Sequence, residues 1–138
     1  MNAPQPVTSP AKRRVTGKVP LTAPKVLIVD DEPDQLSLLS TYFLRAGCQV
    51  VAAIDAEHAL DLPPDISPDL MVLDLRLPGI DGWYLTERLQ ARFPHCPVAI
   101  TSVLDVQDYP RSDSVLPKPV SIGHVKAMLD QLFPDREP

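Results

Sequence analysis

Cysteine is scarce in this sequence: the chain has two, Cys48 and Cys96, and neither belongs to a Cys-x-x-Cys motif. Zinc frameworks and paired-thiol redox motifs are therefore excluded. The sequence does not exclude one disulfide bond between them. Two reduced thiols are the preferred interpretation, for a protein of a reducing compartment. The three histidines are scattered along the chain, so a nucleophilic triad is not indicated.

Long apolar runs are also missing. The longest continuous one, at 50–54, is much shorter than the roughly 20 residues that a membrane-spanning helix needs. The first residues contain no apolar stretch of the secretory type. We therefore expect a soluble, cytoplasmic protein without a membrane partner.

Proline, by contrast, is abundant: the chain has 17, and five of them fall within the first 24 positions. Those 24 residues include four basic side chains and no acidic one, so we predict a disordered basic tail over 1–24. The remainder carries nine basic and 18 acidic side chains, and this negative charge disfavours nucleic acid as a partner of the domain. Residues 134–138 are expected to be a C-terminal end or the start of a linker.

Short apolar segments alternate with amphipathic ones from residue 25 to residue 133, which predicts one α/β domain. Continuous apolar strands are typical of a parallel sheet that helices cover on both faces. We predict a doubly wound, five-stranded sheet of flavodoxin-like order 2-1-3-4-5. Expected strands are 25–30, 48–54, 69–74, 97–101 and 114–116; expected helices begin near 33, 56, 82 and 122. Because Pro110 interrupts 102–113, the fourth helix is expected to be short or missing.

Polar residues follow the predicted strands at one edge of this sheet. The first strand ends at Asp30 and Asp31 and the third at Asp74, with Thr101 and Lys118 at the ends of the last two. Converging carboxylates repel one another unless a cation joins them, and an all-oxygen ligand set favours Mg²⁺. The alternative is that the aspartates only cap a helix or end a strand. A flavin site is disfavoured, because no hydroxyl- and glycine-rich phosphate cradle follows the first strand.

Together these motifs resemble the receiver domain of bacterial two-component response regulators, of the chemotaxis type that consists of a single receiver. The resemblance extends in order from residue 25 to about residue 133. It rests on the acidic pair, the Asp-x-x-x-Pro-Gly-x-Asp-Gly turn, the Thr-Ser pair and the Lys-Pro pair. These motifs are the segments 29–33, 74–82, 100–102 and 118–119.

The resemblance implies a phosphoprotein of phosphorelay signal transduction. Asp74 would accept a phosphoryl group from a histidine kinase or a histidine phosphotransfer protein. Mg²⁺ would be held by Asp31 and Asp74, helped by Asp30 and the backbone carbonyl of Arg76. Thr101 and Lys118 would contact the phosphoryl oxygens, and the bond between Lys118 and Pro119 would be cis. Such a protein is not an enzyme beyond taking up its own phosphoryl group and hydrolysing it.

Two features depart from the family pattern. Val115 occupies the position three residues before the lysine, where receivers usually carry the Tyr or Phe of their switch, and the segment at 102–113 is short. We therefore hypothesise that the signal is read through an altered loop at 103–113. A pseudo-receiver that acts as an interaction module without phosphorylation is the alternative. A small phosphatase is disfavoured, because Arg76 stands where its second carboxylate would be. The downstream protein is not identified by the sequence.

Overall fold

The computed structural model describes residues 23–74, 82–102 and 114–135 of the chain. Its core is a five-stranded parallel sheet with the order β3-β2-β4-β5-β6, which is the predicted order 2-1-3-4-5. The strands are β2 (Lys25–Val29), β3 (Gln49–Ala53), β4 (Leu70–Asp74), β5 (Val98–Ser102) and β6 (Ser114–Pro117). The helices are α1 (Pro33–Arg45), α2 (Ala56–Leu60), η1 (Pro64–Ile66), α3 (Gly82–Arg92) and α4 (Ile122–Leu132).

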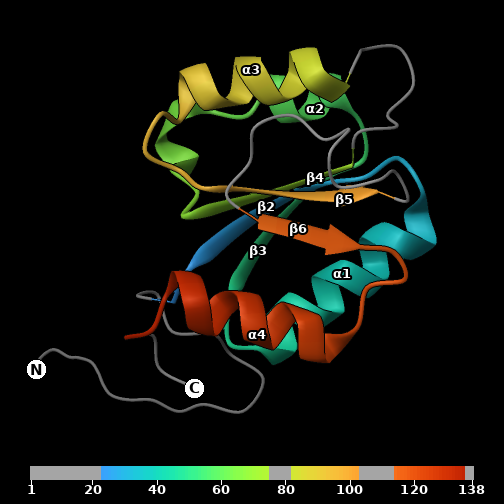
Figure 1. Ribbon diagram of the computed structural model, residues 1–138. Coiled ribbons are helices and arrows are strands. Elements are labelled where there is room, and N and C mark those ends of the chain that lie inside the picture. The colour runs from blue at the N-terminus through green and yellow to red at the C-terminus, as the bar shows by residue number, and fades with distance from the viewer. Residues whose placement is uncertain (1–22, 75–81, 103–113, 136–138) are drawn as a thin grey trace, which may run out of the picture.

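Helices cover both faces of the sheet. In Figure 1, α1 and α4 lie on one face, and α2 and α3 lie on the other. Alternate residues of β2 therefore enter different cores: Val26 and Ile28 pack with α1 and α4, whereas Leu27 and Val29 pack with α2 and α3. This two-sided burial explains why the strands are continuously apolar in sequence.

The predicted boundaries of all five strands are confirmed to within one residue, and helices begin at 33, 56, 82 and 122 as predicted. α2, which Asp55 caps, ends at Leu60 after five residues, and a short 3₁₀ turn, η1, follows it. The carbonyl oxygens of Ala23 and Pro24 accept hydrogen bonds from Gln49, so these last two residues of the predicted tail are bound to the start of β3.

Several predictions concern residues that the structure does not describe. They are the tail over 1–22, the fourth helix within 103–113 and the last three residues. Within the described ranges, no helix is both long enough and apolar enough to cross a bilayer. Cys48 and Cys96 are not joined by a disulfide bond.

Candidate functional site

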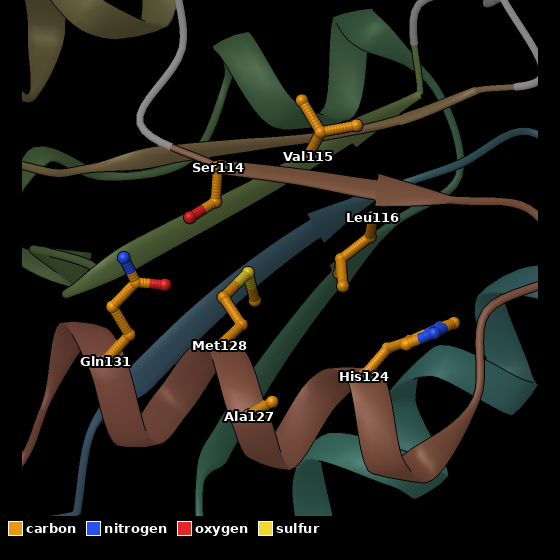
Figure 2. A pocket seen from close by; sticks show the side chains of 7 residues that line it. All are labelled: Ser114, Val115, Leu116, His124, Ala127, Met128 and Gln131. Carbon is orange, nitrogen blue, oxygen red and sulfur yellow. The ribbon is translucent and has the colours of Figure 1, made fainter. Parts of the chain in front are cut away.

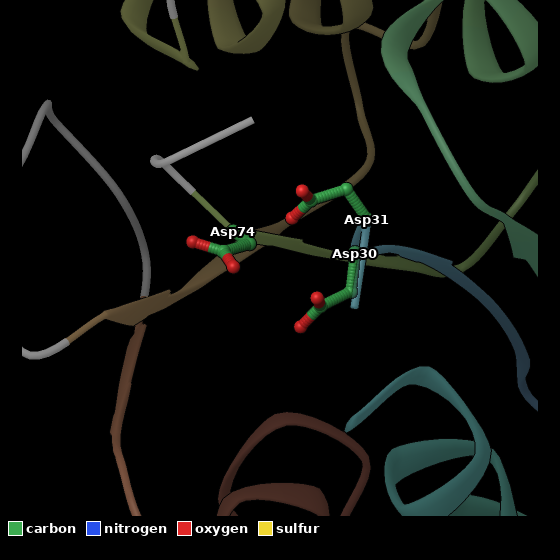
Figure 3. Close-up of side chains that lie close together, drawn as sticks. All are labelled: Asp30, Asp31 and Asp74. Carbon is green, nitrogen blue, oxygen red and sulfur yellow. The ribbon is translucent and has the colours of Figure 1, made fainter. Parts of the chain in front are cut away.

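Three aspartates converge at the carboxyl end of the sheet, next to the place where the chain order reverses. Asp30 and Asp31 follow β2, and Asp74 is the last residue of the neighbouring strand β4. One carboxylate oxygen from each lies within 4.8 Å of the others. Figure 3 shows the three side chains gathered at these strand ends. The predicted acidic cluster is therefore present.

Asp30 is fully buried, and its two carboxylate oxygens differ in their surroundings. Oδ1 accepts a hydrogen bond from the backbone N–H of Glu32 at 2.9 Å. Oδ2 is buried without a hydrogen-bond partner among the described residues, and the closest cation is Lys118 Nζ at 3.9 Å. Burial raises the pKa of the Asp30 carboxyl, with a further contribution from the charges of Asp74 and Asp31; the Glu32 N–H and Lys118 act in the opposite direction. The ionised form of Asp30 would therefore be stabilised by a further positive charge close to Oδ2.

Lys118 contributes a positive charge to the cluster. Its Nζ donates a hydrogen bond to Oδ2 of Asp74 at 2.9 Å. The lysine follows β6 directly, and its peptide bond to Pro119 is cis, as the resemblance implied. The Asp74 side chain is 5% exposed and that of Lys118 is 17% exposed, so the pair is largely shielded from water.

Thr101 lies beside Asp74 across the sheet, because the two are register partners of β5 and β4. The residue is 1% exposed, and its Oγ1 is buried with no hydrogen-bond partner in the described part of the chain. A buried hydroxyl without a partner is costly in a folded protein. Its place next to Asp74 fits a hydroxyl that binds a group attached to that carboxylate.

Glu32 is the residue that the sequence interpretation missed. It is the N-cap of α1, and its carboxylate accepts hydrogen bonds from the backbone N–H groups of Asp34 and Gln35. The alternative that Asp30 and Asp31 cap this helix is therefore wrong. A glutamate is an uncommon cap. The only sequence signal was Pro33 directly after it, because proline favours the first helical position.

Two residues that the sequence analysis singled out, Arg76 and Val115, are not part of the site described above. The backbone carbonyl of Arg76 is outside the described residues. Val115 is half-buried on β6, beside a shallow groove of about 370 Å³ between that strand and α4. In Figure 2 its side chain extends from the strand away from α4, whereas Ser114 and Leu116 extend toward that helix.

The donor set fits a hard divalent cation. All three converging side chains are carboxylates, and the buried Oδ2 of Asp30 has no hydrogen-bond partner in the described ranges, with Lys118 Nζ at 3.9 Å. A small set of oxygen ligands of this kind suits Mg²⁺. An anionic oxygen nucleophile, a lysine and an unsatisfied hydroxyl together form a site that can take a phosphoryl group.

Comparisons with known proteins agree with this geometry. The family model described as "Response regulator receiver domain" matches residues 26–130. The transcriptional activator protein PfeR of Pseudomonas aeruginosa is 33% identical over 121 residues, which are 83% of this chain and 39% of that protein. The chain therefore spans well under two thirds of this curated relative.

Solved structures show the same fold. The receiver domain of the Francisella response regulator 1452 is 31% identical with a TM-score of 0.70, covering 80% of this chain and 97% of that one. The receiver domain of a sensor histidine kinase from Pseudomonas aeruginosa PAO1 is 19% identical with a TM-score of 0.72, covering 80% and 98%. That second structure has a magnesium ion coordinated in its active site cleft.

Proposed function

Because this chain belongs to the response regulator receiver domain family, we propose that Asp74 accepts a phosphoryl group from a phosphohistidine on a partner protein. The observation that carries the proposal is the position of the Asp74 carboxylate. It lies within an acidic triad and accepts a hydrogen bond from Lys118 at 2.9 Å. The donor would be a histidine kinase or a histidine phosphotransfer protein, and the chain would act as a switch or relay of a two-component system.

The transfer is an exchange of bonds at phosphorus. A carboxylate oxygen of Asp74 attacks, a new P–O bond forms, and the P–N bond to the donor imidazole breaks with its electron pair going to the leaving nitrogen. Lys118 offsets negative charge on the phosphoryl oxygens as a point charge. Thr101 Oγ1, which has no hydrogen-bond partner among the described residues, donates to one of these oxygens.

The residues that would hold Mg²⁺ are Asp30, Asp31 and Asp74, with the backbone carbonyl of Arg76 as a further ligand outside the described residues. When bound, the ion neutralises charge on the phosphoryl group during transfer. Asp30 is oriented for this role, since its Oδ1 is held by the N–H of Glu32 while its Oδ2 has no hydrogen-bond partner in the described ranges. The magnesium-bound relative supports the assignment at the level of the fold.

We further propose how the chain uses this site. The chain is not an enzyme with a separate substrate; it takes up a phosphoryl group and loses it again by hydrolysis. It works in the cytoplasm, where its partners are the phosphodonor and a downstream protein. A pseudo-receiver that acts without phosphorylation is the second candidate. It is favoured by one observation, the valine at position 115 where the family usually carries the switch aromatic.

Intact mass after incubation with acetyl phosphate tests the proposal. We expect a Mg²⁺-dependent gain of one phosphoryl group that hydroxylamine removes, as it does from acyl phosphates. Asp74→Asn should show no gain, whereas the control Asp65→Asn, on the exposed η1, should behave like the unaltered protein. Absence of any gain in folded protein would contradict the proposal and favour the pseudo-receiver.

A further inference from the structure

We propose that Glu32 is a positioning residue of the magnesium site, because it caps α1 in place of the aspartates and so leaves their carboxylates for the cation. This inference rests on the proposed function. Glu32 itself is exposed and points its carboxylate at the helix, so it acts through Asp30 and Asp31.

The cap that Glu32 forms satisfies the first turn of α1. Its Oε1 accepts from the N–H of Asp34 at 3.1 Å, and its Oε2 accepts from the N–H of Gln35 at 2.9 Å. Pro33, the first helical residue, has no N–H to satisfy. The N–H groups that would otherwise seek an acceptor at this helix end therefore have one already.

A second helix of the same protein shows what an aspartate does when no such glutamate is present. Asp55 is the second residue after β3, and its Oδ1 accepts from the N–H of His58 at 2.8 Å to cap α2. Asp31 is likewise the second residue after β2. Aspartate is among the strongest N-cap residues, so Asp31 is expected to cap a helix that begins directly after it. Glu32 extends the connection by one residue and takes that role.

Glu32 also fixes the other aspartate through its backbone. Its N–H donates to Oδ1 of Asp30 at 2.9 Å, and its carbonyl oxygen accepts from the N–H of Leu36. The carboxylate, the N–H and the carbonyl of one residue are thus all engaged. Asp30 is held with Oδ2 toward the site, where Lys118 Nζ lies at 3.9 Å. Loss of the side-chain cap would loosen this arrangement and draw the carboxylate of Asp31 toward the open helix end.

Calorimetric titration of the unphosphorylated protein with Mg²⁺ tests the inference without any activity. Glu32→Ala removes the cap, and we expect the Kd of this variant for Mg²⁺ to rise roughly tenfold. Losses of this size are typical when a residue that orients the metal ligands is replaced. Glu32→Ser restores a cap without the charge and should recover most of the affinity. Asp34→Ala removes a negative charge from the same helix turn while keeping its backbone N–H, and should bind like the unaltered protein.

Amide exchange of Asp34 and Gln35 reports directly on the cap. Both N–H groups should exchange faster in Glu32→Ala, and Glu32→Ser should slow at least one of them again. Equal Kd values for Glu32→Ala and the unaltered protein would overturn the inference. So would a Glu32→Ser variant as weak as Glu32→Ala, because charge rather than capping would then set the affinity. If the unaltered protein binds no Mg²⁺, the proposed magnesium site falls and the inference falls with it.

Discussion

Lys118→Met removes a positive charge that lies against two buried carboxylates. The lysine Nζ is 2.9 Å from Oδ2 of Asp74 and 3.9 Å from Oδ2 of Asp30. Methionine keeps much of the length of the aliphatic stem and its packing, so the substitution isolates the charge. In the absence of Mg²⁺, three carboxylates then face one another without the lysine.

The structure sets the expected magnitude. At an effective dielectric constant near 20, the two attractions are about 6 and about 4 kcal/mol before desolvation is counted. Desolvation of the lysine offsets much of this, and loss of one partner from a buried pair costs about 3 to 5 kcal/mol. Because the Lys118 side chain is 17% exposed, we expect the lower value, about 3 kcal/mol. For a domain of this size that loss lowers Tm by about 12 °C.

The effect on Mg²⁺ binding has the opposite sign. The lysine and the cation compete for the same carboxylate oxygens, so Lys118→Met should bind Mg²⁺ more tightly than the unaltered protein. Saturating Mg²⁺ stabilises whichever state binds it, and stabilises the tighter binder more. The stability gap between variant and unaltered protein should therefore narrow as Mg²⁺ is added.

Thermal unfolding followed by circular dichroism, in EDTA and then with increasing Mg²⁺, measures both effects. Lys126→Met on the exposed side of α4 is the matched control and should change little in either condition. The reasoning is refuted if Lys118→Met unfolds in EDTA at the temperature of Lys126→Met. It is also refuted if Lys118→Met binds Mg²⁺ less tightly than the unaltered protein.

Three further predictions concern the scaffold. The backbone N–H of His58, in the first turn of α2, lowers the pKa of Asp55. The ionised carboxylate therefore stabilises the fold above its ordinary pKa, and this stability is lost as pH falls. Asp55→Asn should flatten the decline of Tm below about pH 5. Arg92→Met loses hydrogen bonds to the carbonyl oxygens of Leu60, which ends α2, and of Leu62 just after it. We expect this to cost about 2 kcal/mol in urea unfolding, against about 0.5 for Arg88→Met. Leu39→Ala opens the α1 core and should cost about 3 kcal/mol, whereas Leu44→Ala, at a position 48% exposed, should cost about 0.5 or less.

The fold could be predicted from the sequence because burial on both faces leaves a clear pattern. All five residues of β4 are buried, and its run of apolar side chains ending in an aspartate marks the strand and its end. A chain of alternating strands and helices then allows few arrangements, since crossovers are right-handed. The short turn η1 was not predicted, because two adjacent prolines break the pattern without showing what replaces it.

The position of the site could be predicted from the sequence, whereas the hydrogen bonds between its residues could not. Strand ends place Asp30, Asp74 and Thr101 at one edge whatever their side chains do, so their convergence follows from topology. Which oxygen meets which donor depends on rotamers and on backbone geometry of the connecting residues. The hydrogen bond from Lys118 to Asp74 is a detail of this kind, because it spans 44 residues of sequence.

The N-cap of α1 shows the limit most clearly. In sequence, an aspartate two residues after a strand occurs at both Asp31 and Asp55, and local preference predicts the same role for each. The structure assigns them different roles, because Glu32 intervenes before α1 whereas α2 begins directly after Asp55. Because Asp31 stays in the acidic cluster, it does not contribute the stability that an aspartate cap would add to α1. Burial raises the pKa of Asp30, the charges of Asp74 and Asp31 add to that rise, and a cation among the carboxylates would act against it.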